Sequence, residues 1–183
     1  MESMIIDYYC PDYIVQKKYE IKVNADIHQV YRIARSFNMS NSSLSQWLFK
    51  LRGFPKSLAS IDGLTQFGFV ILGDRKDAEI VFGLIGKFWT FSADIQQLTP
   101  ANFNGFNQKG YAKAVANIAF FPVAGNRTKV VTETRVHCFD GFSGFWFRIY
   151  WTLISPFSGL IRKEWLKTIK QSSEKAETAE SNN

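Results

Sequence analysis

The stretch Gly141–Gln171, GFSGFWFRIYWTLISPFSGLIRKEWLKTIKQ, decides the fold. Between residues 142 and 161 its only charged residue is Arg148, and its apolar residues recur at steps of three and four, the spacing of one side of a helix. The pattern predicts one long helix, interrupted at Pro156 because proline lacks a backbone N–H donor. A helix this apolar needs a cover, which is a bilayer, a partner, or a sheet of its own chain.

The sequence before this helix predicts one strand, two short helices and six further strands. The predicted strands are 13–23, 66–72, 79–85, 87–93, 104–108, 112–121 and 128–139, and the predicted helices are 27–37 and 44–51. Strands joined by short loops pair as antiparallel neighbours, and only the last helix is large enough to cover their apolar side. We therefore expect an α+β helix-grip fold, a curved antiparallel sheet of about seven strands wrapped around the long C-terminal helix.

Composition favours one domain. The chain has 183 residues, of which 46% are hydrophobic and 16% aromatic, enough for one sizeable core without a compositional shift that would mark a second. We expect a lead-in at 1–12, a single helix-grip domain at 13–171 and a disordered tail at 172–183, where Ser, Glu and Ala dominate.

The charge and cysteine patterns exclude several function classes. Net charge is +6, but the basic residues are scattered as pairs and do not interleave with aromatics, so we expect no nucleic-acid partner. Cys10 and Cys138 belong to no metal-ligand spacing and are expected as free thiols. The N-terminus lacks a basic region followed by a long apolar one, so we expect a cytoplasmic protein. No metal or nucleotide cofactor is predicted, because the motifs that hold them are missing from the sequence.

Four local stretches add a resemblance to a known family. They are Gly83–Trp89 (GLIGKFW), Gly110–Asn117 (GYAKAVAN), Thr132–Val136 (TETRV) and Pro156–Arg162 (PFSGLIR). With the element order, they make the chain resemble the SRPBCC helix-grip superfamily of START-like, birch-pollen-allergen-like and polyketide-cyclase-like proteins, and more narrowly an uncharacterised bacterial branch of it. The resemblance implies a cavity between sheet and long helix that holds a hydrophobic or lipid-like molecule. Superfamily members range from carriers to cyclases and hydratases, so the resemblance implies no particular reaction.

Alternation along the last strand predicts which side chains face the cavity. Thr132 and Thr134 share one side with apolar residues, while Glu133, Arg135 and His137 lie on the other side and are expected to face water. A hydroxyl on an apolar inner side needs a partner, which can be the backbone, water or a ligand, and the sequence leaves these open. If Ala114 and Ala116 of the preceding strand face the same interior, their small side chains either leave room for a cavity or allow the long helix to pack close to the sheet.

The remaining candidates come from the long helix and from other strands. On the helix, one stripe is expected to face the sheet, whereas Phe147 and Trp151 fall off it and must meet the early helices or stay exposed. The side chain of Trp89 can face either way, because Gly83 and Gly86 permit a bulge before it. Core packing explains the helical stripe as well as ligand contact does. The predicted ligand-binding residues are Phe82, Trp89, Ile118, Phe120, Thr132, Thr134, Trp146, Tyr150, Leu153 and Phe157.

These patterns favour binding of a hydrophobic small molecule or lipid over catalysis. The only histidines are His28 and His137, both expected at the surface, and no nucleophile or metalloprotease motif is present. The alternatives are a cyclase- or hydratase-type enzyme acting in the same cavity and a structural or interaction domain with a filled core. The apolar helix also suggests a further hypothesis, a transient contact with a membrane surface. The sequence leaves the oligomeric state open.

Overall fold

The structure, a computed structural model, describes residues 3–36, 65 and 68–181 of the chain. Its elements are α1 (Ile5–Tyr9), β1 (Val15–Val23), α2 (Ile27–Arg35), β2 (Val70–Arg75), β3 (Glu79–Gly86), α5 (Pro100–Phe103), β4 (Ala112–Val123), β5 (Arg127–Cys138) and α6 (Gly141–Ser181). This is the predicted order of an α+β fold that ends in a long helix. The second short helix predicted at 44–51 lies outside the described residues.

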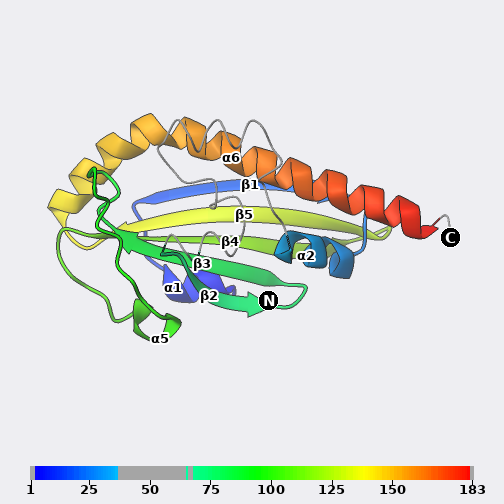
Figure 1. Cartoon of the computed structure of the whole chain (residues 1–183), viewed down its shortest axis with the longest axis horizontal. Coiled ribbons are helices and arrows are strands. Elements are labelled where there is room, and N and C mark those ends of the chain that lie inside the picture. The colour runs from blue at the N-terminus through cyan, green and yellow to red at the C-terminus, as the bar shows by residue number, and fades with distance from the viewer. Residues whose placement is uncertain (1–2, 37–64, 66–67, 182–183) are drawn as a thin grey trace.

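The described strands form one antiparallel sheet in the order β1-β5-β4-β3-β2. Figure 1 shows α6 arching over one side of this sheet, with α1 and α5 on the other. We call these the α6 side and the α1 side. The α6 side also carries α2, whose Val30 and Ala34 join a buried core with Leu166 and Ile169 of α6. The α6 helix therefore covers the sheet as the sequence predicted.

The sheet has five strands in the described residues, whereas the sequence predicted about seven. The stretch 87–93 forms turns, because Ala93 and Asp94 adopt left-handed backbone angles of φ 54° and 41° that no strand permits. Just before 104–108, Pro100 opens the short helix α5, with Asn102 accepting a 2.7 Å hydrogen bond from the backbone N–H of Thr99. Neither stretch joins the sheet.

The α1 side of the sheet corrects the expectation that Glu133 and Arg135 face water. Both are buried, and the Arg135 guanidinium pairs with Glu133 at 2.5 Å and with Asp7 of α1 at 2.8 Å. It also donates to the backbone carbonyl of Cys10 at 3.1 Å. The charged side of β5 is therefore covered by the N-terminal segment, whose acidic residue and carbonyl satisfy the buried cation.

The long helix begins at a side-chain cap and continues beyond its predicted end. The Asp140 carboxylate accepts a 2.9 Å hydrogen bond from the backbone N–H of Ser143. At the other end α6 runs to Ser181, whereas a disordered tail was predicted from residue 172. The buried Ser173 accepts a 2.8 Å hydrogen bond at its backbone carbonyl from Gln29 of α2, so the start of the expected tail is packed.

Candidate functional site on the α6 side of the sheet

The first turns of α6 pack in an aromatic cluster. The ring of Phe147 is buried and stacks on Trp151 at a centroid distance of 5.8 Å. Phe88 and Trp89, from the turn after β3, meet the same ring edge-on at 6.3 Å each. Phe147 also packs with Val136 of β5 and Ala112 of β4. We call the rings Phe88, Trp89, Phe147, Tyr150 and Trp151 the aromatic cluster; it fixes the start of α6 to one end of the sheet.

The C-terminal half of α6 packs in a second core, which we call the distal core. Its buried members from α6 are Leu166 and Ile169, and Ile161 and Trp165 pack against it. The sheet contributes the side chains that the β3–β4–β5 register places on one side, namely Ile80, Phe82, Ile118, Phe120 and Val130. The distal core therefore fixes the second half of α6 to the other end of the sheet.

Between these two packed regions α6 arches over the sheet, as Figure 1 shows. Phe147 packs with Val136, and Arg162 donates a hydrogen bond to Thr132, only four residues back along β5. Four strand residues span about 13 Å, whereas the 15 helical residues between the two anchors span about 22 Å. Pro156 lies inside this part of α6, and Figure 1 shows the helix curved there. We call residues 148–161 the arch.

On β4 and β5, the side chains at the level of the arch are small or carry hydroxyls, whereas the paired positions of β1 and β3 hold the larger Lys17, Tyr19 and Phe82. Ala116 of β4 pairs directly with Thr134 of β5, and Ala114 pairs with Val136. Directly paired residues of an antiparallel sheet project to the same side, so Ala114 and Ala116 share the α6 side with Thr132 and Thr134. Among the described residues, the hydroxyl of the half-buried Thr134 has no hydrogen-bond partner.

Arg162 lies where the arch meets the distal core. Its Nη1 donates a 2.6 Å hydrogen bond to Oγ1 of Thr132, and Thr132 in turn donates its own proton to the backbone carbonyl of Asn117 at 2.8 Å. The side chain thus reaches across the edge strand β1 to the second strand of the sheet. Burial lowers the pKa of Arg162 to about 10, with Tyr19 acting in the opposite direction, so the group stays cationic at neutral pH.

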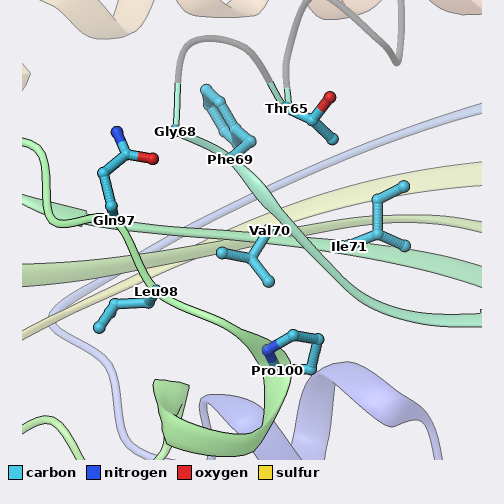
Figure 2. Close-up of a pocket in the computed structure, with 8 residues that line it drawn as sticks. All are labelled: Thr65, Gly68, Phe69, Val70, Ile71, Gln97, Leu98 and Pro100. Atoms are coloured by element: carbon cyan, nitrogen blue, oxygen red, sulfur yellow. The ribbon is translucent and has the colours of Figure 1, made fainter.

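A separate pocket of about 270 Å³ opens at the start of the edge strand β2. Figure 2 shows its lining, which comes from β2, from the segment just before it and from the loop leading into α5. Phe69 and Ile71 also pack against the distal core, whereas Val70 belongs to the core on the α1 side. The pocket therefore lies across the edge of the sheet, and none of the sequence-predicted site residues lines it. Its lining residues are Thr65, Gly68, Phe69, Val70, Ile71, Gln97, Leu98 and Pro100.

The structure distributes the ten predicted site residues over four places. Phe82, Ile118 and Phe120 belong to the distal core, and Trp89 and Tyr150 to the aromatic cluster. Thr132 is buried with its hydroxyl bonded to backbone, while Thr134 faces the arch. Phe157 is partly buried within the arch. Trp146 and Leu153 are 43% and 67% exposed, on the outer side of α6. Whether any of them contacts a ligand stays a prediction.

The exposed Trp146 and Leu153 correct the predicted orientation of α6. The side that meets the sheet passes through Phe147, Trp151 and Arg162, two of which the sequence had placed off the stripe. Because apolar residues occur on both sides of this helix, their period alone could not choose between them. Arg162 was missed altogether, since a single arginine after an apolar run is normally a surface residue.

The two histidines lie away from the arch. His28 contacts Asp77 at 2.6 Å with an exposed ring, and the ring of His137 lies 3.1 Å from the backbone carbonyl of Asp12, on the α1 side. Within the described ranges no cluster of three His, Cys, Asp or Glu side chains is placed to hold a metal ion. No helix in the described part of the chain combines the length and apolar character needed to cross a membrane. Among the described residues, the functional groups of the sheet and of α6 that lie near the arch include Arg162, Thr132, Thr134 and the hydroxyl of Tyr19.

Comparison with known proteins gives weak structural similarity. No family model and no curated protein matches the chain. It is similar to a hypothetical protein from Helicobacter pylori, with 8% identity, a TM-score of 0.41 and coverage of 91% of this chain and 92% of that one. A putative uncharacterized protein from Rhizobium leguminosarum shares 13% identity with a TM-score of 0.36, and the match covers 86% of this chain and 96% of that one. The di-domain ARO/CYC protein StfQ from the steffimycin biosynthetic pathway shares 11% identity with a TM-score of 0.32, and the match covers 88% of this chain and 46% of that one. The function has to be inferred from this chain's own residues.

Proposed function

We propose that the protein binds an apolar small molecule, of lipid or polyketide-like character, between the sheet and the arch of α6. The observation that carries the proposal is the mismatch between helix and strand length from Phe147 to Arg162. The two ends of the arch are anchored 15 helical residues apart on a stretch of β5 that spans about 13 Å. Figure 1 shows the helix arched between these anchors; Ala116 lies between them along the sheet, whereas Ala114 packs against the aromatic cluster.

The side chains beneath and within the arch support this proposal. On β4 and β5 they are Ala116 and Thr134, and on α6 they include Ser155 and Ser158, so these described positions place little side-chain volume beneath the arch. The unpartnered hydroxyl of Thr134 adds one polar group that can orient a ligand. The surroundings are otherwise apolar at both ends, from the aromatic cluster to the distal core.

Native mass spectrometry of protein purified without detergent, followed by organic extraction, tests the proposal. We expect a stoichiometric apolar molecule, and raised thermal stability when an apolar compound is added to the emptied protein. In the variant Ser158→Phe, an aromatic ring occupies the arch, and the bound fraction should fall at least tenfold. The matched control Ser172→Phe, at an exposed position of α6, should bind like wild type.

Three outcomes would change the proposal. Binding that is equally strong in Ser158→Phe would place the ligand elsewhere and overturn the proposal. An empty protein that no apolar compound stabilises would favour a structural or interaction domain with a filled core. Recovery of an added compound in a chemically changed form would support the alternative of a cyclase- or hydratase-type enzyme working in the same place.

A further inference from the structure

Two arginines lie on opposite sides of the sheet and have different partners. Arg135, on the α1 side, is buried and paired with the carboxylates of Glu133 and Asp7. Arg162, on the α6 side, is partly buried; it donates to the neutral hydroxyl of Thr132 and lies over the Trp165 ring at 5.8 Å, and no carboxylate of the described residues forms an ion pair with it. A charge withdrawn from water is stabilised by a partner of opposite sign, and Arg162 has none among the described carboxylates.

The hydrogen bonds around Thr132 fix how Arg162 presents its charge. The Thr132 hydroxyl has one proton, which it gives to the Asn117 carbonyl, so its oxygen can only accept from Arg162. One terminal nitrogen of the guanidinium is thereby held at β5, and the remaining N–H groups are left for another acceptor. A planar guanidinium with free donors matches a carboxylate with two parallel hydrogen bonds.

We propose that Arg162 binds the acid group of an amphipathic ligand, a carboxylate attached to an apolar chain or ring system that lies under the arch. This inference rests on the proposed function, and it specifies the chemical class of the ligand. One cation selects a singly charged head group, and the hydroxyl of Thr134, about 6.6 Å along β5 from Thr132, can donate to the same molecule. Lys17, which pairs with Thr134 from the edge strand β1, adds positive charge at the rim.

A matched pair of probes tests the inference, namely dodecanoate and 1-dodecanol, which differ only in the head group. Isothermal titration calorimetry at pH 7.4 should give a Kd for dodecanoate at least tenfold below that for dodecanol. In Arg162→Met that preference should disappear, with dodecanol binding within threefold of wild type. The control Lys163→Met removes the neighbouring charge, whose ammonium lies over the Tyr19 ring at 5.9 Å, and should keep the preference.

The outcomes separate this inference from the proposed function. Equal binding of both probes by wild type, or an acid preference that survives in Arg162→Met, overturns the inference and leaves the proposed function standing. Binding of neither probe by wild type overturns both. The melting temperature of the empty protein provides a second readout, because replacing a partly buried cation that has no carboxylate partner with an apolar side chain should leave this temperature unchanged or raise it. A clear fall would mean that Arg162 has a structural partner instead.

A second inference comes from the outer side of α6, independently of any ligand. Six large apolar side chains on this side are exposed, and they recur along the helix at the spacing of one stripe. An exposed apolar surface of this length is unusual and marks a docking site. We call this set the outer stripe: Phe142, Phe145, Trp146, Ile149, Leu153 and Leu160.

The charges beside the outer stripe indicate its partner. Between Gly141 and Lys163 the sequence of α6 contains no carboxylate; Arg162 is directed to the sheet, whereas the basic Arg148 and Lys163 are exposed. Aromatic and aliphatic residues on one side of a helix, flanked by basic groups, are the pattern of helices that lie in the surface of an anionic bilayer. We infer that the outer stripe docks on an anionic membrane surface with α6 parallel to it.

Vesicle sedimentation tests this docking. Wild type should sediment with phosphatidylglycerol-containing vesicles at low salt, and less at high salt, because the basic flank contributes. The double variant Trp146→Ser/Leu153→Ser should reduce the bound fraction at least tenfold, while the control Phe91→Ser, which removes a still more exposed ring outside α6, should not. Absence of vesicle binding at low salt overturns the inference. A wild-type dimer that Trp146→Ser/Leu153→Ser converts to monomer would assign the outer stripe to self-association instead.

Discussion

The hydroxyl of Thr132 donates a 2.8 Å hydrogen bond to the backbone carbonyl of Asn117, and this bond connects the two sides of the sheet. On the α6 side, the same hydroxyl accepts from Arg162. On the α1 side, the Asn117 amide donates to the carboxylate of Glu79 at 2.7 Å and accepts from the backbone N–H of Glu133 at 2.9 Å. The position of the proposed ligand anchor is therefore coupled to a buried network that includes the N-terminal helix, since Glu79 also accepts from the N–H of Ile5 at 2.6 Å.

The first prediction concerns this network. Replacing Asn117 by alanine leaves the buried Glu133 N–H without its partner and removes the shorter of two hydrogen bonds to Oε1 of Glu79, which keeps a longer one from the N–H of Ile6 at 3.4 Å. An unsatisfied buried group costs about 1–3 kcal/mol and a lost hydrogen bond to a charged group about as much, so we expect Asn117→Ala to lower the free energy of unfolding by roughly 2–5 kcal/mol. Urea unfolding measures this loss, with the exposed Asn107→Ala as control. A loss below about 1 kcal/mol would mean that water replaces the amide at this site.

The second prediction tests the orientation of α6 with two adjacent residues. Phe147 is 1% exposed among four other rings, whereas Trp146 lies on the outer stripe. Truncating a buried phenylalanine costs about 3–5 kcal/mol, so Phe147→Ala should be strongly destabilising. Trp146→Ala should change the free energy of unfolding by less than about 1 kcal/mol, because Trp146 is 43% exposed and its ring contacts are with the likewise exposed Phe142 and Phe145. Thermal or urea unfolding of both variants measures the two losses of stability. A larger loss in Trp146→Ala than in Phe147→Ala would support the orientation of α6 that was predicted from the sequence.

The sequence predicted the elements better than it predicted their surroundings. All five strands of the sheet and the long helix follow from alternation and from steps of three and four, because these periods reflect local backbone geometry. Which side of an element is buried depends on distant segments instead. The sequence predicted that Glu133 and Arg135 face solvent, because Asp7, which pairs with Arg135, is more than a hundred residues away and lies in a helix of only five residues. Arg162 was missed for the same reason, because its position depends on a hydrogen bond to Thr132, which belongs to a different element.

The third prediction concerns acid stability at the start of α6. Backbone N–H groups of Gly110 and Ser143 donate to the Asp140 carboxylate and hold its pKa below the ordinary value. Because the folded pKa is the lower one, this carboxylate stabilises the fold fully above the unfolded pKa of about 3.9, and the contribution is lost as pH falls through the folded value. Asp140→Asn should therefore be less stable than wild type at pH 7, and the difference should shrink towards pH 2.5. Urea unfolding across this range measures it; a difference that does not change with pH would contradict the mechanism.

The last prediction concerns the close approach of the arch to the edge strand. Gly159 of α6 packs against β1, where an added Cβ would lie 2.5 Å from the Tyr19 hydroxyl oxygen and 3.4 Å from the ring carbon that carries it. Gly159→Ala would normally stabilise a helix by up to about 1 kcal/mol, but here the overlap must push either the ring or the helix aside. We expect a net loss of about 1–2 kcal/mol in the free energy of unfolding. Tyr19→Phe removes the overlapping oxygen and leaves the ring, so Gly159→Ala made in that background should be neutral or stabilising. A double-mutant cycle by urea unfolding gives the coupling between the two positions. Equal effects of Gly159→Ala in both backgrounds would show that α6 moves away from β1 freely, and the arch would then not be fixed at this point.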